Sequence, residues 1–87
     1  MSDLTTSPRM EGILERAAEI GRVHTGEPFV GTETVLRALV EDRDGIAALV
    51  LRELGVTDRI AARLDEIMDS ASYRAPAQGS KAPRPNE

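Results

Sequence analysis

The near absence of aromatic residues and cysteine means that a core in this chain has to be built mainly from aliphatic side chains. It contains no cysteine, a single histidine, His24, and two aromatic residues, Phe29 and Tyr73. Disulfides and thiolate metal sites are therefore excluded, and one histidine cannot form a metal site by itself. In a chain of 87 residues a single core rarely supplies more than about 3–5 kcal/mol of net stability. We therefore expect either economical helix packing or oligomerisation to supply further support.

The N-terminal part of the chain has the start signal, the period and the stop signal of an α-helix. Ser7 is an N-cap candidate, and Pro8 suits the first helical position, where its missing N–H is not needed. Gly26 and Pro28 end the helix. Gly21 marks either the close approach of another segment or an early end. The apolar residues between these signals repeat at helical spacing: Met10, Ile13, Leu14, Ala17 and Ile20.

Three further helices follow, and no strand pattern is present. Thr32 is the N-cap candidate of the second helix, and Thr57 is that of the fourth. The third helix runs from about residue 45 to 54, ends at Gly55 and is apolar almost all round, so we expect it to be central and mostly buried. The sequence predicts an all-α fold, a compact four-helix orthogonal bundle. The fourth helix is expected to turn these residues inward: Ile60, Ala61, Leu64, Ile67 and Met68.

The composition divides the chain into three parts. Residues 1–6 are short and polar and are predicted to be flexible. Residues 7–69 contain all four predicted helices. Residues 70–87 are rich in Ala and Pro, have no apolar period and are predicted to form a disordered tail, because they cannot offset the entropy of ordering.

The charge and motif content argue against several functions. The net charge is −4 with no basic run, so nucleic acid is not an expected partner. The longest apolar stretch, residues 46–51, is far shorter than a bilayer span, and no signal peptide is evident. We therefore expect a cytoplasmic protein that does not bind membranes. No nucleophile–base set, metal-ligand set or phosphate loop is present, so neither catalysis nor a cofactor is expected.

One alternative function remains open at this point. Small helical domains include helix-turn-helix regulators, and the turn formed by residues 41–45 could separate two such helices. The recognition helix would then be residues 46–54, in which Arg52 is the only basic residue. The apolar residues of that helix are better suited to a core, so DNA binding is the second hypothesis.

For most other polar residues the structural interpretation is the simpler one. Thr32 and Glu33 make a good helix start in any protein. His24 is expected to be a solvated residue near a helix end. The remaining acidic clusters are expected to form a plain charged turn or a solvated helix face: Glu41, Asp42 and Asp44, then Asp65, Glu66 and Asp69.

Several segments, in their order and spacing, resemble one Clp amino-terminal repeat. This repeat builds the N-domain of the AAA+ unfoldases ClpA, ClpB and ClpC, and the likeness covers about residues 7–68. It is closest to the second repeat of the ClpC type. The segments that carry it are Ser7-Pro8-Arg9, Ile13-Leu14-Glu15, Phe29-Val30-Gly31-Thr32-Glu33, Asp44-Gly45-Ile46-Ala47-Ala48 and residues 50–56.

The resemblance implies protein binding. N-domains of this family dock adaptors and substrates, and those of the ClpC type recognise phosphorylated arginine. Carried over, the ligand-binding residues would be Thr32, Glu33 and Thr34, with Glu33 facing the guanidinium and the helix start taking the phosphate. Thr34 stands where the family usually has histidine. No Walker motif accompanies the repeat, so the expected role is a non-catalytic module that modulates a Clp protease system or acts as its decoy.

The resemblance also implies self-association. The family's N-domain normally contains two tandem repeats that pack with pseudo-two-fold symmetry, whereas this chain has one. A homodimer would restore that packing, and closed two-fold dimers are the commonest oligomers. The sequence does not identify the dimer face. The exposed parts of the first helix near residues 17–21 are one candidate, because small residues permit close approach.

Overall fold

The computed structural model describes residues 4–73, and these form four α-helices and no strand. The predicted all-α class is therefore confirmed. Residues 1–3 and 74–87 lie outside the described part of the chain, and with them most of the predicted tail. The helices are α1 (Pro8–Thr25), α2 (Thr32–Glu41), α3 (Ile46–Leu54) and α4 (Thr57–Met68).

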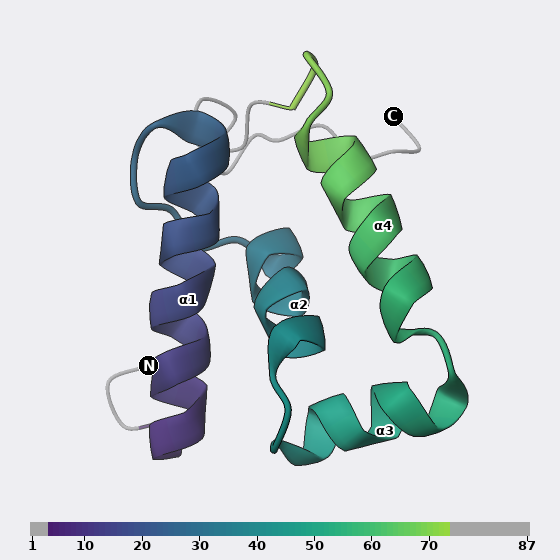
Figure 1. Cartoon of the computed structure of the whole chain (residues 1–87). Helices are drawn as coiled ribbons and strands as arrows, with labels where there is room; N and C mark the ends of the chain where they lie inside the picture. The colour runs from purple at the N-terminus through teal and green to yellow at the C-terminus, as the bar shows by residue number, and fades with distance from the viewer. Residues whose placement is uncertain (1–3, 74–87) are drawn as a thin grey trace.

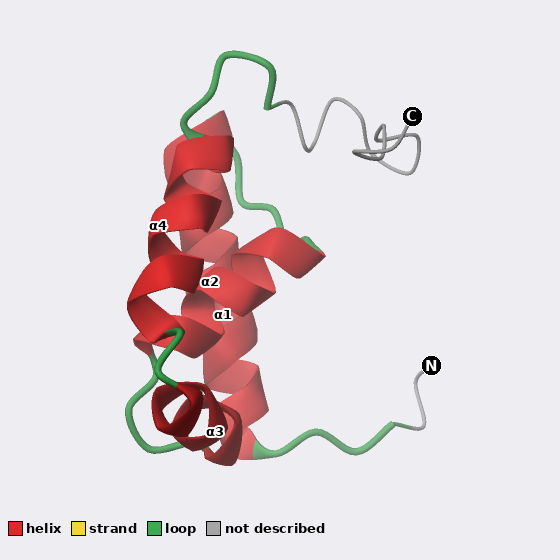
Figure 2. Cartoon of the chain, turned by 90° about the vertical axis from the view of Figure 1, so that its right-hand side faces the viewer, coloured by secondary structure: helices red, strands yellow, loops and turns green. Residues whose placement is uncertain are grey.

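The helices form one layered arrangement with α3 set across its end. In Figure 1, α2 lies between α1 and α4, and α3 crosses below them, between the end of α2 and the start of α4. Figure 2 shows the same arrangement from the side, with α4 in front and α3 at the foot of the bundle. Contacts between α1 and α2 are the most extensive, and those of α3 with its neighbours are sparse.

The ends of α1 are those predicted from the sequence. The Ser7 hydroxyl accepts a hydrogen bond from the Met10 N–H at 3.0 Å, and Pro8 is the first helical residue. At the other end Gly26 adopts φ 91°, in the left-handed region, and its N–H donates to the Arg22 carbonyl at 2.7 Å. Such a left-handed glycine is a common helix stop because it carries no Cβ.

Gly21 is the point where the α1–α2 loop packs against α1. A Cβ added at Gly21 would lie 2.2 Å from the carbonyl oxygen of Phe29. Gly21 itself is buried inside the helix and does not end it. Of the two predicted roles for Gly21, the close approach is therefore the correct one.

Small residues form the centre of the core. Ala17 and Ala38 are 0% and 1% exposed, so α1 and α2 approach closely there. Ala17 and Gly21 are buried in the chain's own core, so these two residues are not available as a dimer face. The other buried members are Ile13, Ile20 and Met68, and the partly buried residues packed on them are Met10, Val35, Leu39, Leu64 and Tyr73.

Helix α3 differs most from its predicted position. It was expected to be central, but Ala48 is its only buried residue. Leu51 is partly buried, but the other four large apolar side chains of the helix are exposed. Their exposed fractions are 81% for Ile46, 44% for Leu49, 46% for Val50 and 69% for Leu54.

Two predicted caps and one predicted core residue are also wrong. The N-caps are Gly31 and Val56, so Thr32 and Thr57 are instead the first residues of α2 and α4. The Thr57 hydroxyl is buried and has no hydrogen-bond partner among the described residues. Ile67 is 42% exposed, because it lies at the edge of the α4 face that packs on the bundle.

Candidate functional site

The start of α2 lies at the surface beside the α1–α2 loop. Thr32 is exposed, Glu33 is half-buried and Thr34 is buried. The N-cap, Gly31, has no side chain, so it cannot accept a hydrogen bond from the first N–H groups of α2. Unpaired N–H groups at a helix start attract anions. This end of α2 therefore presents N–H groups next to one carboxylate.

Thr34 is part of the helix cap. Its hydroxyl accepts from the Gly31 N–H at 2.8 Å and donates to the Gly31 carbonyl at 3.0 Å. The residue is 0% exposed. The structure therefore places Thr34 beneath the surface, where its side chain cannot touch a ligand unless the cap opens, whereas Thr32 and Glu33 remain near the surface.

Tyr73 contacts the carboxylate of Glu33. Its hydroxyl donates a hydrogen bond to Glu33 Oε2 across 40 residues of sequence, and its ring packs against the hydrophobic core. Burial, and then the neighbouring Glu33 carboxylate, raise the pKa of the Tyr73 hydroxyl well above its usual range. Tyr73 belongs to the stretch predicted to be a disordered tail. Its contacts with Glu33 and the core place it against the bundle.

An apolar groove runs along α2 next to this site. It begins at the exposed Thr32 and has an aliphatic floor, so a ligand bound at the start of α2 would have apolar surface beside it. The groove is lined by Val30, Gly31, Thr32, Val35, Leu36 and Leu39.

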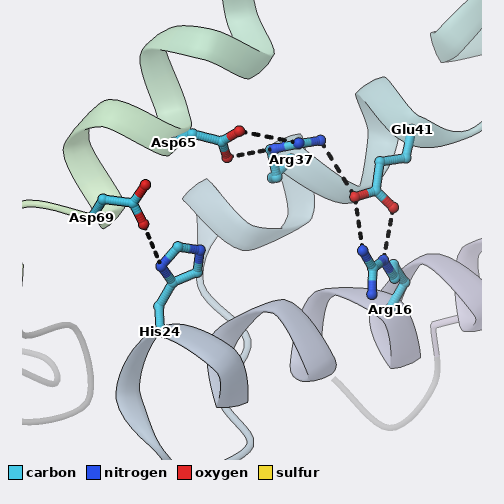
Figure 3. Close-up of polar contacts among 6 residues, drawn as sticks. All are labelled: Arg16, His24, Arg37, Glu41, Asp65 and Asp69. Carbon is cyan, nitrogen blue, oxygen red and sulfur yellow. Dashed lines mark hydrogen bonds and ion pairs between the residues drawn. The ribbon is translucent and has the colours of Figure 1, made fainter.

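A charged network joins three helices on another side of the molecule (Figure 3). The Arg16 guanidinium of α1 donates to both oxygens of Glu41 at 2.7 and 2.9 Å. Glu41 also accepts from Arg37 at 3.3 Å, and Arg37 donates to both oxygens of Asp65 on α4 at 2.8 and 3.2 Å. Asp65, expected to be solvated, and Glu41, expected in a plain turn, thus link α1, α2 and α4.

His24 and Asp69 extend this side of the molecule. The Nδ1 atom of His24 lies 3.2 Å from Asp69 Oδ1, and the imidazole ring is mostly covered. The ring also meets Tyr73 edge to face, with centroids 6.5 Å apart. The expectation of a solvated histidine is therefore wrong. No signal in the sequence marked this contact, because its partners come from separate elements.

The network is structural in character. Hydrogen bonds from Arg16 hold the pKa of Glu41 below its usual value, and hydrogen bonds from Arg37 do the same for Asp65. These carboxylates are satisfied by partners within the chain. Among residues 4–73, no group of three or more acidic or histidine side chains is arranged to hold a metal ion.

The acidic turn after α2 organises the start of α3. Asp42 accepts from Arg9 at 2.7 Å and from the Gly45 N–H at 3.0 Å. Arg52, the single basic residue of α3, reaches back toward the Asp42 carbonyl at 3.5 Å. This arrangement offers no basic surface on α3, so nothing in it favours the helix-turn-helix hypothesis. None of the described helices is long and apolar enough to cross a membrane.

The comparisons with known proteins agree with the helical architecture. Residues 5–86 match the family described as the Clp repeat (R) N-terminal domain. The chain is 42% identical over 55 residues to the "ATP-dependent Clp protease ATP-binding subunit ClpA homolog" of Trieres chinensis, covering 63% of this chain and 6% of that protein. It is 30% identical over 81 residues to the "Chaperone protein ClpB" of Oceanobacillus iheyensis, covering 92% of this chain and 10% of that protein.

The similarity is confined to a small part of these relatives. A second ClpA homolog, from Cyanidium caldarium, is 43% identical over 54 residues, which is again 6% of its length. No solved structure matches the chain significantly. The family match nevertheless spans nearly all of the sequence. The chain is therefore a member of the Clp repeat N-terminal domain family.

Proposed function

We propose that this chain is a non-catalytic interaction module of a Clp system, working in the cytoplasm. It would bind adaptors, substrates or arginine-phosphorylated proteins, and by doing so would modulate a Clp unfoldase or act as a decoy for its N-domain. The observation that carries the proposal is the match of residues 5–86 to the Clp repeat N-terminal domain family.

The start of α2 is the proposed ligand site. A phosphorylated guanidinium carries both an anionic and a cationic group. The N–H groups at the start of α2 suit the phosphate, and the Glu33 carboxylate suits the guanidinium. Thr32 is exposed at the same end, and the groove beyond it would hold an apolar neighbour of the ligand. Thr34 is buried and its hydroxyl is bonded to Gly31, so we do not expect it to contact the ligand directly.

A titration of the full chain with free phosphoarginine, followed by NMR, tests the site. We expect backbone shifts that saturate and are confined to residues 31–36. The side chain of free arginine has only the cationic group, and that of phosphoserine has only the anionic group, so both should bind more weakly. Shifts spread evenly over the surface, or none at all, would reject the site.

Two glutamate variants provide the matched comparison. Glu33→Gln removes the proposed guanidinium partner and should weaken binding by about tenfold or more, because a charge-assisted hydrogen bond is lost. Glu27→Gln makes the same change at an exposed residue of the α1–α2 loop and should leave binding unchanged. Recovery of Clp components or their adaptors on the immobilised chain, and their loss with Glu33→Gln, would extend the result to proteins.

Self-association is the second part of the proposal. The expectation of a homodimer is supported by the small core and by the amount of large apolar surface that α3 leaves exposed. Sedimentation equilibrium of the full chain over a range of concentrations tests it, and a monomer at all concentrations would refute it.

A further inference from the structure

Two neighbouring helices carry the same five-position pattern with opposite charges. Residues separated by three, four, seven and eight positions share one face of a helix. On α3 this face contains one acid, and on α4, with its cap, it contains two arginines. The α3 stripe is Ile46, Leu49, Val50, Glu53 and Leu54; the α4 stripe is Val56, Arg59, Ile60, Arg63 and Leu64.

The α3 stripe faces away from the bundle. All five of its members are exposed, and the helix touches the bundle through the opposite side, at Ala48. Apolar residues at amphipathic spacing normally mark the buried side of a helix. On α3 the apolar side is exposed and packs against none of the described residues. Contiguous exposed apolar surface of this kind is typical of an interaction site.

The α4 stripe forms a groove that could receive such a helix face. Together with Leu36 of α2, it lines an open groove of about 550 Å³. The aliphatic residues Ile60 and Leu64 are only partly exposed, whereas Arg59 and Arg63 are exposed at its rim. The groove therefore has an apolar floor and a basic edge, and the α3 stripe has an apolar surface and an acidic centre.

We propose that the α3 stripe of one copy docks in the α4 groove of a second copy, and reciprocally, in a closed two-fold dimer. Each subunit supplies both complementary surfaces, so one symmetry operation satisfies both at once. Glu53 of each copy would then face Arg59 and Arg63 of the other. Glu53 and Arg59 make no ion pair among the described residues, so both are available for this contact.

The inference names the face used by the proposed homodimer, and it does not require the α2 ligand site. It predicts that association depends on these two stripes and not on α1. Charge pairing across the interface makes the prediction specific, since like charges placed opposite one another are strongly unfavourable.

Sedimentation equilibrium of the full chain and two charge-reversal variants tests the inference. Glu53→Arg places a base against the basic rim, and Arg59→Glu places an acid against Glu53. Each variant alone should raise the dimer dissociation constant by about tenfold or more. Mixing the two variants should restore association, because in the mixed dimer both contacts pair opposite charges.

Matched controls separate the interface from general effects. Glu15→Arg makes the same charge change on the exposed surface of α1, and Val23→Ser removes an exposed apolar side chain there. Both should dimerise like the wild type. Circular dichroism and thermal melting confirm that each variant is folded.

Several outcomes would overturn the inference. If the chain stays monomeric up to millimolar concentration, both the homodimer and the proposed interface are refuted. If neither charge reversal changes the dimer dissociation constant, the dimer forms through another surface. Masses that keep growing with concentration indicate head-to-tail assembly, which excludes the closed dimer. Phosphoarginine binding is measured separately on the same samples. The absence of ligand binding can therefore be distinguished from the absence of dimerisation.

Discussion

The contact between α1 and α2 and the outer face of α3 use apolar residues in opposite ways. The first is built from small residues, Ala17 and Ala38, and from Gly21, on which the loop at Phe29 rests. The second displays large aliphatic residues to solvent. The more apolar helix is thus the less buried one. The comparison teaches that close backbone approach, and not the number of large apolar side chains, decides where this core forms.

The largest expected effect tests the close approach at Gly21. Gly21→Ala should lower the free energy of unfolding by at least about 2 kcal/mol, because the new methyl would overlap a backbone carbonyl that cannot turn aside. In a domain of this size the melting temperature should then fall by roughly 8–16 °C. Thermal melting followed by circular dichroism measures it.

Gly12→Ala is the matched control for Gly21→Ala. Gly12 lies in the same helix, and an added Cβ there meets nothing within 4 Å. Alanine should therefore stabilise the helix by about 0.5–1 kcal/mol. Equal effects of the two substitutions would show that packing against Phe29 does not matter.

The buried cap at Thr34 should give the next largest effect. Thr34→Val keeps the shape but leaves the Gly31 N–H without its acceptor, which should cost about 1–3 kcal/mol. Thr32→Val makes the same change at the exposed first residue of α2 and should have little effect on stability. Chemical denaturation measures both, and a loss confined to Thr32→Val would contradict the assignment of the cap.

The charged network should contribute less. Arg37→Met should lower stability by about 0.5–1 kcal/mol at neutral pH and low salt, since solvent screens these partly exposed pairs. Hydrogen bonds from Arg37 hold the folded pKa of Asp65 below its ordinary value of 3.8, and Arg37 adds a smaller part to the lowering of the Glu41 pKa below 4.5, which is mainly due to Arg16. The stabilisation is therefore present above pH 4.5 and is lost as the pH falls through the lowered values. Urea titrations at several pH values check this.

Arg63→Met is the control for the network. Arg63 pairs with Glu66 within α4, and both side chains are much more exposed than the Arg37–Glu41 pair. At concentrations below those at which association is detected, the loss of this pair should change the free energy of unfolding by a barely measurable amount. A pH-independent loss for Arg37→Met would mean that its aliphatic stem, and not its charge, stabilises the bundle.

The smallest effect is expected on the outer face of α3. Ile46→Ser should change the stability of the monomer by less than about 0.5 kcal/mol, as is usual for exposed positions. The same substitution at the buried Ile13 should cost about 3 kcal/mol or more. The measurement is made at concentrations below those at which association is detected. A large loss for Ile46→Ser would show that this face is buried within the single chain.

The helix ends could be predicted because their causes are local. Ser7, Pro8 and Gly26 act through their own backbone and the next few residues. The N-caps of α2 and α4 were predicted one residue too late. The residues at these positions, Gly31 and Val56, make no side-chain cap hydrogen bond, so the sequence carries no capping side chain that would mark them. The proposed ligand residues Thr32, Glu33 and Thr34 came from the resemblance alone. The contact of Glu33 with Tyr73 could not be foreseen across 40 residues.

The sequence by itself determined that four helices form, where they stop and to which family the repeat belongs. These follow from glycine, proline and capping residues and from the apolar period, all of which act over a few positions. Only the tertiary structure decided that Gly21 receives the loop, that Asp65 pairs with Arg37 and that α3 turns its apolar stripe outward. The physical reason is that a period shows which side of a helix is apolar, but not whether the rest of the chain covers it.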